Sequence, residues 1–242
     1  METETSAAEI APYQKYNGVA DLREELLELI AELKAKKQRK IADPSALCTA
    51  AFSLTNFLLA VVQLKLVPAS FLQIVAPQAL FYGGAVQFVY GLVCCFTNNM
   101  FGVMVYPSFG AFWIALGFLI TMEAEGVYVF PGNEGNHALG FLLVGWLIYS
   151  IFLWIATFTH HVAAVGAFTS LVIMLILYIL ADFGVIHSTI PGGIFGLSLS
   201  GFGWYVALAV LVNDNCGCTV FPLGTFNRVP FLDKTGKVFR SR

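Results

Sequence analysis

The residues of this chain that could do chemistry are hydroxyl and amide side chains that stand singly in long apolar stretches. Those that we single out are Thr55, Asn56, Tyr82, Gln87, Ser108 and Ser170. A buried amide is costly unless it is paired, so Gln87 either bonds a neighbouring helix or lines a polar path, and Tyr82 and Asn99 have the same two interpretations. Such dipoles offset part of the desolvation cost of a small polar solute. Asn56 is the path residue that we favour in its stretch.

The ionisable side chains nearest the apolar stretches stand at their ends. They are His160, His161, Asp182, His187 and Asp214. The His160-His161 pair is either a polar turn at an interface or a mouth that senses pH. Asp182 either caps the end of a helix or faces an aqueous vestibule. None of these residues has the neighbours of a catalytic acid, base or nucleophile.

The five cysteines do not form a pattern typical of disulfides or metal sites. The pairs Cys94-Cys95 and Cys216-Gly217-Cys218 lack the C-x-x-C spacing of zinc sites, and no histidine is spaced to complete a ligand set, so we expect no metal. Neither a Gly-rich phosphate loop, nor H-E-x-x-H, nor G-x-S-x-G is present. We therefore expect no cofactor and no enzymatic activity.

The elements that must position these residues follow from composition. The chain is 58% hydrophobic and 12% charged, its mean hydropathy is +0.76, and no Lys or Arg stands between Lys65 and Arg228. A soluble fold needs charge over its whole surface, and no basic patch suggests a nucleic-acid partner. We therefore predict an all-α polytopic membrane protein in contact with lipid, with six transmembrane helices. The predicted spans are roughly 45–66, 70–96, 104–122, 138–158, 163–181 and 190–213.

The polar ends of the chain predict its domains and orientation. Residues 1–42 are expected to form a cytosolic extension whose amphipathic helix, over 18–40, either contacts a partner or a membrane surface or packs on the protein's own cytosolic face. Residues 43–224 would form the six-helix domain, which Asp43-Pro44 begins, and 225–242 a basic tail. Basic residues at 34–40 and in the tail place both termini in the cytosol by the positive-inside rule. We expect the plasma membrane.

Four motifs stand in order along the apolar region. They are DPSALC at 43–48 with Phe52 and Thr55, FYGGAVQ at 81–87 followed by Asn99, PSFGAFW at 107–113, and Tyr205 with Asn213-Asp214 and PLG at 222–224. They resemble the patterns NPAPLGL, FYGG-x-x-Q, TSYGSFW and NE with P-x-G of the acetate uptake transporter family. That family holds the bacterial succinate-acetate permeases and the fungal and protist acetate and ammonium exporters. The similarity spans about 43–224.

The resemblance implies a bundle of six helices per subunit, a ring-shaped homo-hexamer and a path for a small-molecule substrate inside each subunit. It assigns the constriction of that path to Phe52, Phe109 and Leu171, and it places Gly203 where a small residue affects the passage of larger carboxylates. The family usually has a glutamate at the position of Cys94. Because a buried thiol is a poor proton carrier at neutral pH, this departure favours passive or weakly coupled movement.

Three functions are compatible with these observations. The first is a transporter or channel-like permease for acetate and related short monocarboxylates, with proton symport as one form. The second is export of ammonia or ammonium, which an aromatic gate without basic residues suits equally well. The third, of another class, is a membrane scaffold or nutrient sensor that no longer transports. The altered first motif and the 42-residue extension favour this third hypothesis.

Overall fold

The structure is a computed structural model that describes residues 22–30, 41–224 and 226. The chain divides into two compact units, Met1–Ala42 and Asp43–Arg242. In the first unit, residues 22–30 are helical and expose Leu22, Leu26 and Leu29. The remainder of the helix predicted over 18–40, its basic cluster and the basic residues of the tail lie outside the described residues.

In the second unit, the described residues include six helical segments that are long and apolar enough to cross a membrane. They are α2 (Ser45–Gln63), the composite segment Ala69–Phe96, α5 (Met100–Ala124), α6 (Glu134–Thr157), α7 (Val162–Asp182) and α8 (Ile190–Cys216). Their bounds differ from the predicted ones by at most four residues. The prediction of an all-α polytopic fold with six spans is therefore confirmed.

The second span differs from the uninterrupted helix that its apolar run predicts. It consists of the 3₁₀ turn η2 (Ala69–Phe71), α3 (Leu72–Leu80), the π-helical η3 (Phe81–Val86), α4 (Gln87–Val93) and the 3₁₀ turn η4 (Cys94–Phe96). The π segment coincides with the FYGG motif, and π segments recur at functional sites. At Gly83 a Cβ would lie 2.5 Å from Thr55 Oγ1, so the glycine permits close contact with α2.

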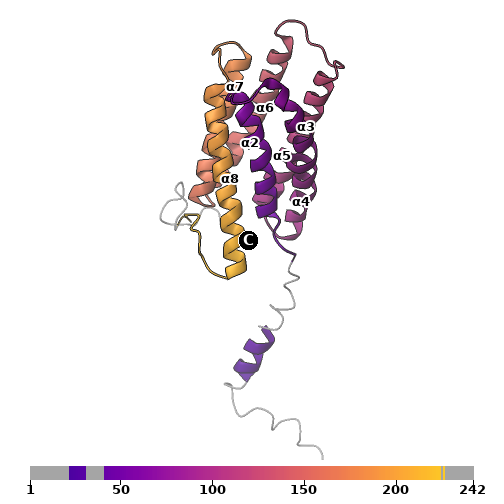
Figure 1. Cartoon of the computed structure of the whole chain (residues 1–242). Helices are drawn as coiled ribbons and strands as arrows, with labels where there is room; N and C mark the ends of the chain where they lie inside the picture. Colours follow the sequence, from indigo (N-terminus) through magenta and orange to yellow (C-terminus); the bar gives the residue numbers. More distant parts are fainter. Residues whose placement is uncertain (1–21, 31–40, 225, 227–242) are drawn as a thin grey trace, which may run out of the picture. The chain divides into compact units, whose positions relative to one another are not determined.

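The six spans form a closed ring of neighbours. In this ring α2 packs on α8, α8 on α7, and α7 on α6, while α5 packs on α3 and α4, which return to α2. Figure 1 shows α8 beside α7 and α2, and α3 beside α5. Between α5 and α6 the backbones make few contacts, and the indole of Trp146 fills the gap against Phe109 and Phe112. The interior of the ring is therefore closed by side chains on that side.

Side chains cap the helix starts at the end of the bundle where α2, α5 and α7 begin. Asp43 Oδ1 accepts from Ser45 N (2.9 Å), Asn99 Oδ1 from Gly102 N (2.8 Å), and His161 Nδ1 from Ala164 N (3.0 Å). These bonds satisfy amide donors that have no partner within the helix. α2 begins at Ser45 with Pro44 at the N-cap position, so the helix starts one residue later than Asp43-Pro44 predicted, and Asp43 bonds the Ser45 amide from the residue before the N-cap.

Candidate functional site

Two cavities lie inside the ring of helices, displaced toward opposite ends of the bundle. One, of about 200 Å³, includes Asp182 in its lining, and we call it the Asp182 cavity. The other, of about 300 Å³, includes His160, and we call it the His160 cavity. Among the described residues, those that line both cavities are Phe52, Phe109 and Leu171. These three residues therefore stand at the boundary between the cavities.

The boundary is apolar and closely packed. Phe52 comes from α2, Phe109 from α5 and Leu171 from α7, and the two phenyl rings meet edge to face with centroids 5.8 Å apart. Phe109 is 5% exposed and Leu171 is 3% exposed. Such a constriction opposes the passage of a hydrated ion and favours a neutral or briefly dehydrated solute.

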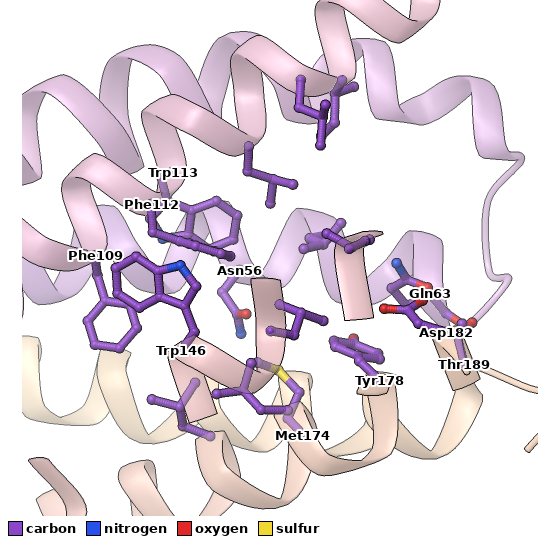
Figure 2. Close-up of a pocket in the computed structure, with 18 of the residues that line it drawn as sticks. Asn56, Gln63, Phe109, Phe112, Trp113, Trp146, Met174, Tyr178, Asp182 and Thr189 are labelled. Atoms are coloured by element: carbon purple, nitrogen blue, oxygen red, sulfur yellow. The ribbon is translucent and has the colours of Figure 1, made fainter. Parts of the chain in front are cut away.

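Next to the constriction, the Asp182 cavity has an aromatic wall. Trp146 lies 5.5 Å from Phe109 and 5.0 Å from Phe112, and Trp113 lies 6.1 Å from Phe52, all measured between ring centroids. Figure 2 shows these aromatic side chains together at one end of the cavity, with Asn56 between them and Tyr178. This end of the cavity therefore offers mainly apolar surface.

At its other end the Asp182 cavity is lined by polar and acidic side chains. Gln63, Tyr178, Asp182 and Thr189 gather there in Figure 2, and Glu123 belongs to the same lining. Asp182 Oδ2 is buried and has no hydrogen-bond partner among the described residues. Asp182 ends α7, where a carboxylate faces the negative end of the helix dipole, so it is not a stabilising cap. The lining supports its interpretation as a vestibule residue.

Polar groups in the His160 cavity mostly bond one another. Thr49 and Tyr106 share a hydrogen bond of 3.0 Å between their hydroxyls, and Asn99 Nδ2 donates to Asp43 Oδ2 (3.2 Å) and to Ser45 Oγ (2.9 Å). All five side chains line the cavity. Asn99 thus joins the starts of α2 and α5 as well as capping the latter.

In the His160 cavity, Gln87 is the polar side chain that does not follow this pairing. Its side chain is 1% exposed and lines the cavity, while its Oε1 is buried with no donor among the described residues. Its backbone oxygen accepts from Cys48 Sγ, at 3.8 Å. Of the two interpretations given for Gln87, lining the path is the one that this placement supports.

The two adjacent histidines stand at the mouth of the His160 cavity. Burial lowers the pKa of His160 below its usual 6.5, and burial together with the neighbouring His160 lowers the pKa of His161. His161 Nδ1 accepts a hydrogen bond from Ala164 N, so this nitrogen carries no proton. Both imidazoles are therefore mainly neutral at pH 7.

A segment after α8 folds back toward the same mouth, and we call residues 220–224 the C-terminal strap. Gly224 O and Leu223 O accept from the first amides of α7, at Val162 N (2.8 Å) and Ala163 N (3.2 Å). Asn213 holds the strap through three hydrogen bonds. Its Oδ1 accepts from Val220 N (2.7 Å) and from Phe221 N (2.9 Å), and its Nδ2 donates to Phe221 O (2.8 Å). Leu223 lines the cavity, so the strap forms part of its rim.

The structure gathers some of the predicted site residues at the cavities and separates others from them. Those that line a cavity are Phe52, Asn56, Gln87, Phe109, Leu171 and Gly203. Thr55 is buried and donates to Ala51 O, Ser170 pairs with Ser198, and Tyr82 lines neither cavity. Ser108 bonds Tyr149 at a separate, shallow groove. Cys94 is fully buried, and a Cβ on Gly102 would lie 2.8 Å from its Sγ.

Sequence reasoning missed the aromatic wall and the Thr49–Tyr106 pair. Trp113 follows Phe109 by four residues, and Asn56 follows Phe52 by four, so a search for i+4 neighbours of the constriction would have found Trp113. No comparable signal marks Trp146, because α6 contains many apolar residues without a polar face. Among the described residues no cluster of His, Cys, Asp or Glu is placed to hold a metal ion.

The chain is similar to proteins of known families along most of its length. The family model described as GPR1/FUN34/yaaH matches residues 27–227. The "Glyoxylate pathway regulator" of Yarrowia lipolytica is 36% identical over 203 residues, which cover 81% of this chain and 72% of that protein. "Ammonia transport outward protein 2" of Saccharomyces cerevisiae is 29% identical over 187 residues, which cover 76% of this chain and 66% of that one.

A solved structure is similar as well. The structure described as that of the bacterial acetate channel SatP matches with a TM-score of 0.71 and 26% sequence identity. The match covers 76% of this chain and 100% of that chain. The similar part of the fold therefore corresponds in extent to the whole of that chain.

Proposed function

Because the chain belongs to the GPR1/FUN34/yaaH family, we propose that it is a membrane permease for acetate and related short monocarboxylates. The solute path runs through the Asp182 cavity, past the constriction, and through the His160 cavity. The observation that carries this proposal is the position of Phe52, Phe109 and Leu171, which line both cavities in a multi-pass bundle.

Uptake of labelled acetate into proteoliposomes tests the proposal. We expect saturable uptake above that of protein-free liposomes near pH 7.5, where lipid permeation by the neutral acid is small. Leu171→Phe narrows the constriction and should lower uptake about tenfold, because steric and desolvation barriers rise together. Uptake by the wild-type protein that does not exceed that of empty liposomes contradicts the proposal.

A matched variant separates blockage from general damage. Ile176 lies on the same helix and is 40% exposed, so Ile176→Phe adds the same aromatic volume outside the packed interior. This control should retain uptake within about twofold, since exposed apolar substitutions perturb folding little. Equal losses in the two variants would mean that α7, rather than the constriction, limits uptake.

Ammonia or ammonium export is the second candidate function. It is favoured by Glu123 and Asp182 in the lining of one cavity, by the absence of Lys and Arg from residues 66–227, and by the similarity to a protein named for ammonia transport. Flux of methylammonium in the same vesicles tests it. Methylammonium movement without saturable acetate uptake favours this candidate over the first.

We place the protein in the plasma membrane with both termini in the cytosol. Cys95, Cys216 and Cys218 are exposed and lie within or just after η4 and α8, at the ends of two spans, whereas Val129, 78% exposed, lies in the connection between α5 and α6. A membrane-impermeant thiol reagent added to intact cells should label Val129→Cys and leave the three native cysteines unlabelled. The reverse pattern contradicts this orientation.

The assembly and the roles of the ends are also proposals. We propose a homo-hexamer of six-helix subunits (43–224), a cytosolic extension (1–42) and a basic tail (225–242). Native mass spectrometry in detergent should give six copies. Deleting 1–42 should leave acetate uptake intact in a permease, whereas a scaffold or nutrient sensor would lose its partner and show no uptake in the first place.

A further inference from the structure

Asn56 presents a free hydrogen-bond acceptor to the Asp182 cavity. The side chain is 3% exposed, and its Nδ2 donates to Gly196 O and to Ser200 Oγ, both at 2.8 Å. Because a backbone carbonyl can only accept, the bond to Gly196 fixes which end of the amide is the nitrogen. Oδ1 is the other end, and no donor among the described residues bonds to it, although Asn56 lines the cavity.

Trp113 lines the same cavity and has an unpaired donor. It is 2% exposed, and its Nε1 is buried with no acceptor among the described residues. An indole N–H can only donate, and a buried donor without a partner is costly, so this position calls for a ligand with an acceptor atom. The ring itself is held edge to face against Phe52 and Phe112.

The two free groups lie at a similar level of the bundle. Asn56 stands one helical turn beyond Phe52 on α2, and Trp113 one turn beyond Phe109 on α5, toward the end of each helix nearer the Asp182 cavity. Phe52 and Phe109 are in contact at the constriction. Both groups therefore meet a solute just before it reaches the constriction.

The charges around this cavity disfavour an anion. Asp182 and Glu123 line it, and residues 66–227 contain no Lys or Arg that could neutralise a carboxylate. A bound acetate ion would also set an acceptor oxygen against Asn56 Oδ1. A neutral carboxylic acid avoids both costs, because it has one O–H donor and one carbonyl acceptor.

We propose that Asn56 and Trp113 form a binding site for the neutral, protonated form of the carboxylic acid. This inference rests on the proposed permease function. Asn56 Oδ1 accepts the acid O–H, and Trp113 Nε1–H donates to the acid carbonyl oxygen. The proton then crosses with the solute as part of one molecule and leaves it in water on the far side. Coupled movement of acetate and proton needs no intramembrane carboxylate in this scheme, which fits a cysteine at position 94.

Acetamide is the probe that separates the neutral form from the anion, because it has the same size, donates through nitrogen, accepts through oxygen and does not titrate near neutral pH. Binding of acetate and of acetamide to the full-length protein in nanodiscs would be followed by tryptophan fluorescence from about pH 5 to about pH 8. The apparent affinity for total acetate should fall about tenfold per pH unit above the pKa of the acid. The affinity for acetamide should stay constant.

Variants test the two residues. Asn56→Leu should weaken acetamide and low-pH acetate binding about tenfold, whereas Ser200→Ala, which removes a partner of Nδ2 but leaves Oδ1 in place, should weaken it less than about threefold. Trp113→Phe keeps the aromatic ring and should also weaken both probes, with Trp146 remaining as a reporter. Methylammonium, which has no acceptor, should be insensitive to Trp113→Phe.

Several outcomes would overturn the inference. An acetate affinity that does not change with pH, or acetamide that neither binds nor competes, identifies the anion as the bound form. Methylammonium binding that depends on Asn56, with no acetamide binding, identifies a site for ammonium instead. In either case saturable acetate uptake can persist, so the failure of this inference is distinguishable from failure of the permease proposal, which is the absence of uptake.

Discussion

The two cavities on either side of the constriction differ in how their polar groups are used. In the His160 cavity, most hydroxyl and side-chain amide groups bond one another or the helix starts, and Gln87 Oε1 is the exception. In the Asp182 cavity, Asn56 Oδ1, Trp113 Nε1 and Asp182 Oδ2 have no partner among the described residues. Free groups favour a ligand, whereas paired groups favour rigidity. On the proposed path, the Asp182 side would therefore bind the solute, and the His160 side would hold the helix starts around the opposite mouth.

Removing the Phe109 ring from the boundary between the two cavities should have the largest effect on uptake. Phe109→Ala would join the two cavities, so uptake of larger carboxylates should rise about tenfold or more while selectivity for acetate falls. The truncation should also lower the free energy of unfolding by about 3–5 kcal/mol, because the ring is buried against Phe52 and Trp146. Uptake of acetate, lactate and succinate in proteoliposomes, with chemical denaturation in detergent, measures both effects.

Phe118→Ala is the control for that experiment. Phe118 lies on the same helix and is 49% exposed, so its truncation removes little buried area. It should leave substrate selectivity unchanged. If Phe109→Ala shows the selectivity of the wild type, the boundary does not act as the filter, and the difference between the two cavities loses its functional meaning.

Loosening the C-terminal strap at the rim of the His160 cavity should have the next largest effect. Asn213→Ala removes three hydrogen bonds to the strap and should lower its local stability by about 1–3 kcal/mol. The amides of Val162 and Ala163, which bond the strap, should then exchange hydrogen about tenfold faster. Asn215→Ala is the matched control, since Asn215 is exposed two residues away. Exchange that is unchanged in Asn213→Ala would show that the strap is held by other contacts.

The fold of this protein was largely predictable from sequence, because membrane spans are set by local composition. The gap in basic residues and the lengths of the apolar runs placed all six spans to within four residues. The π segment at Phe81–Val86 was not predictable in this way. Within it Gly83 lies close to Thr55, which belongs to a different helix, and apolar periodicity does not report such contacts.

The site was predictable only in part. Phe52, Phe109 and Leu171 came from a family resemblance, and the structure brings them together. Sequence favoured Asn56 over Thr55 as the path residue of α2, and Asn56 lines a cavity whereas Thr55 does not. The pairing state of each polar group depends on which neighbour it faces, so sequence could not show that Asn56 keeps a free oxygen while the Thr55 hydroxyl bonds the backbone of its own helix. Helical faces one residue apart differ by 100°, and that difference decides which residue reaches the cavity.

Acidification should lower the stability of the protein through His161 at the His160 cavity, and this effect should be smaller than the preceding ones. The pKa of His161 is lowered in the folded protein, so the unfolded chain binds more protons as the pH falls below 6.5. Stability should therefore be constant above about pH 6.5 and decline below it, with a melting temperature lower by about 1–3 °C. A proton on Nδ1 would also break the bond from Ala164 N that caps α7.

His161→Asn tests the cause of this decline. Asparagine caps a helix as well as histidine does but does not titrate, so the variant should retain its neutral-pH melting temperature and lose part of the decline. His160 remains, and burial lowers its pKa as well, so part of the pH dependence should persist. Melting curves recorded from about pH 8 to about pH 5 would show an unaltered decline if His161 is not responsible.

The smallest effect is expected at Cys94, which lines neither cavity. Its thiol is fully buried beside Gly102, so Cys94→Ser should cost about 1–2 kcal/mol of stability through an unpaired hydroxyl and leave acetate uptake within about twofold. Cys94→Glu should lower the yield of folded protein instead of creating a proton relay, since a carboxylate there has no space and meets no Lys or Arg within residues 66–224. If proton-coupled uptake disappears in Cys94→Ser while folding is retained, the thiol takes part in transport. The Asp182 cavity and the His160 cavity would then be linked through the packed region between α2 and α5. In that case the proton would not cross solely as part of the neutral acid.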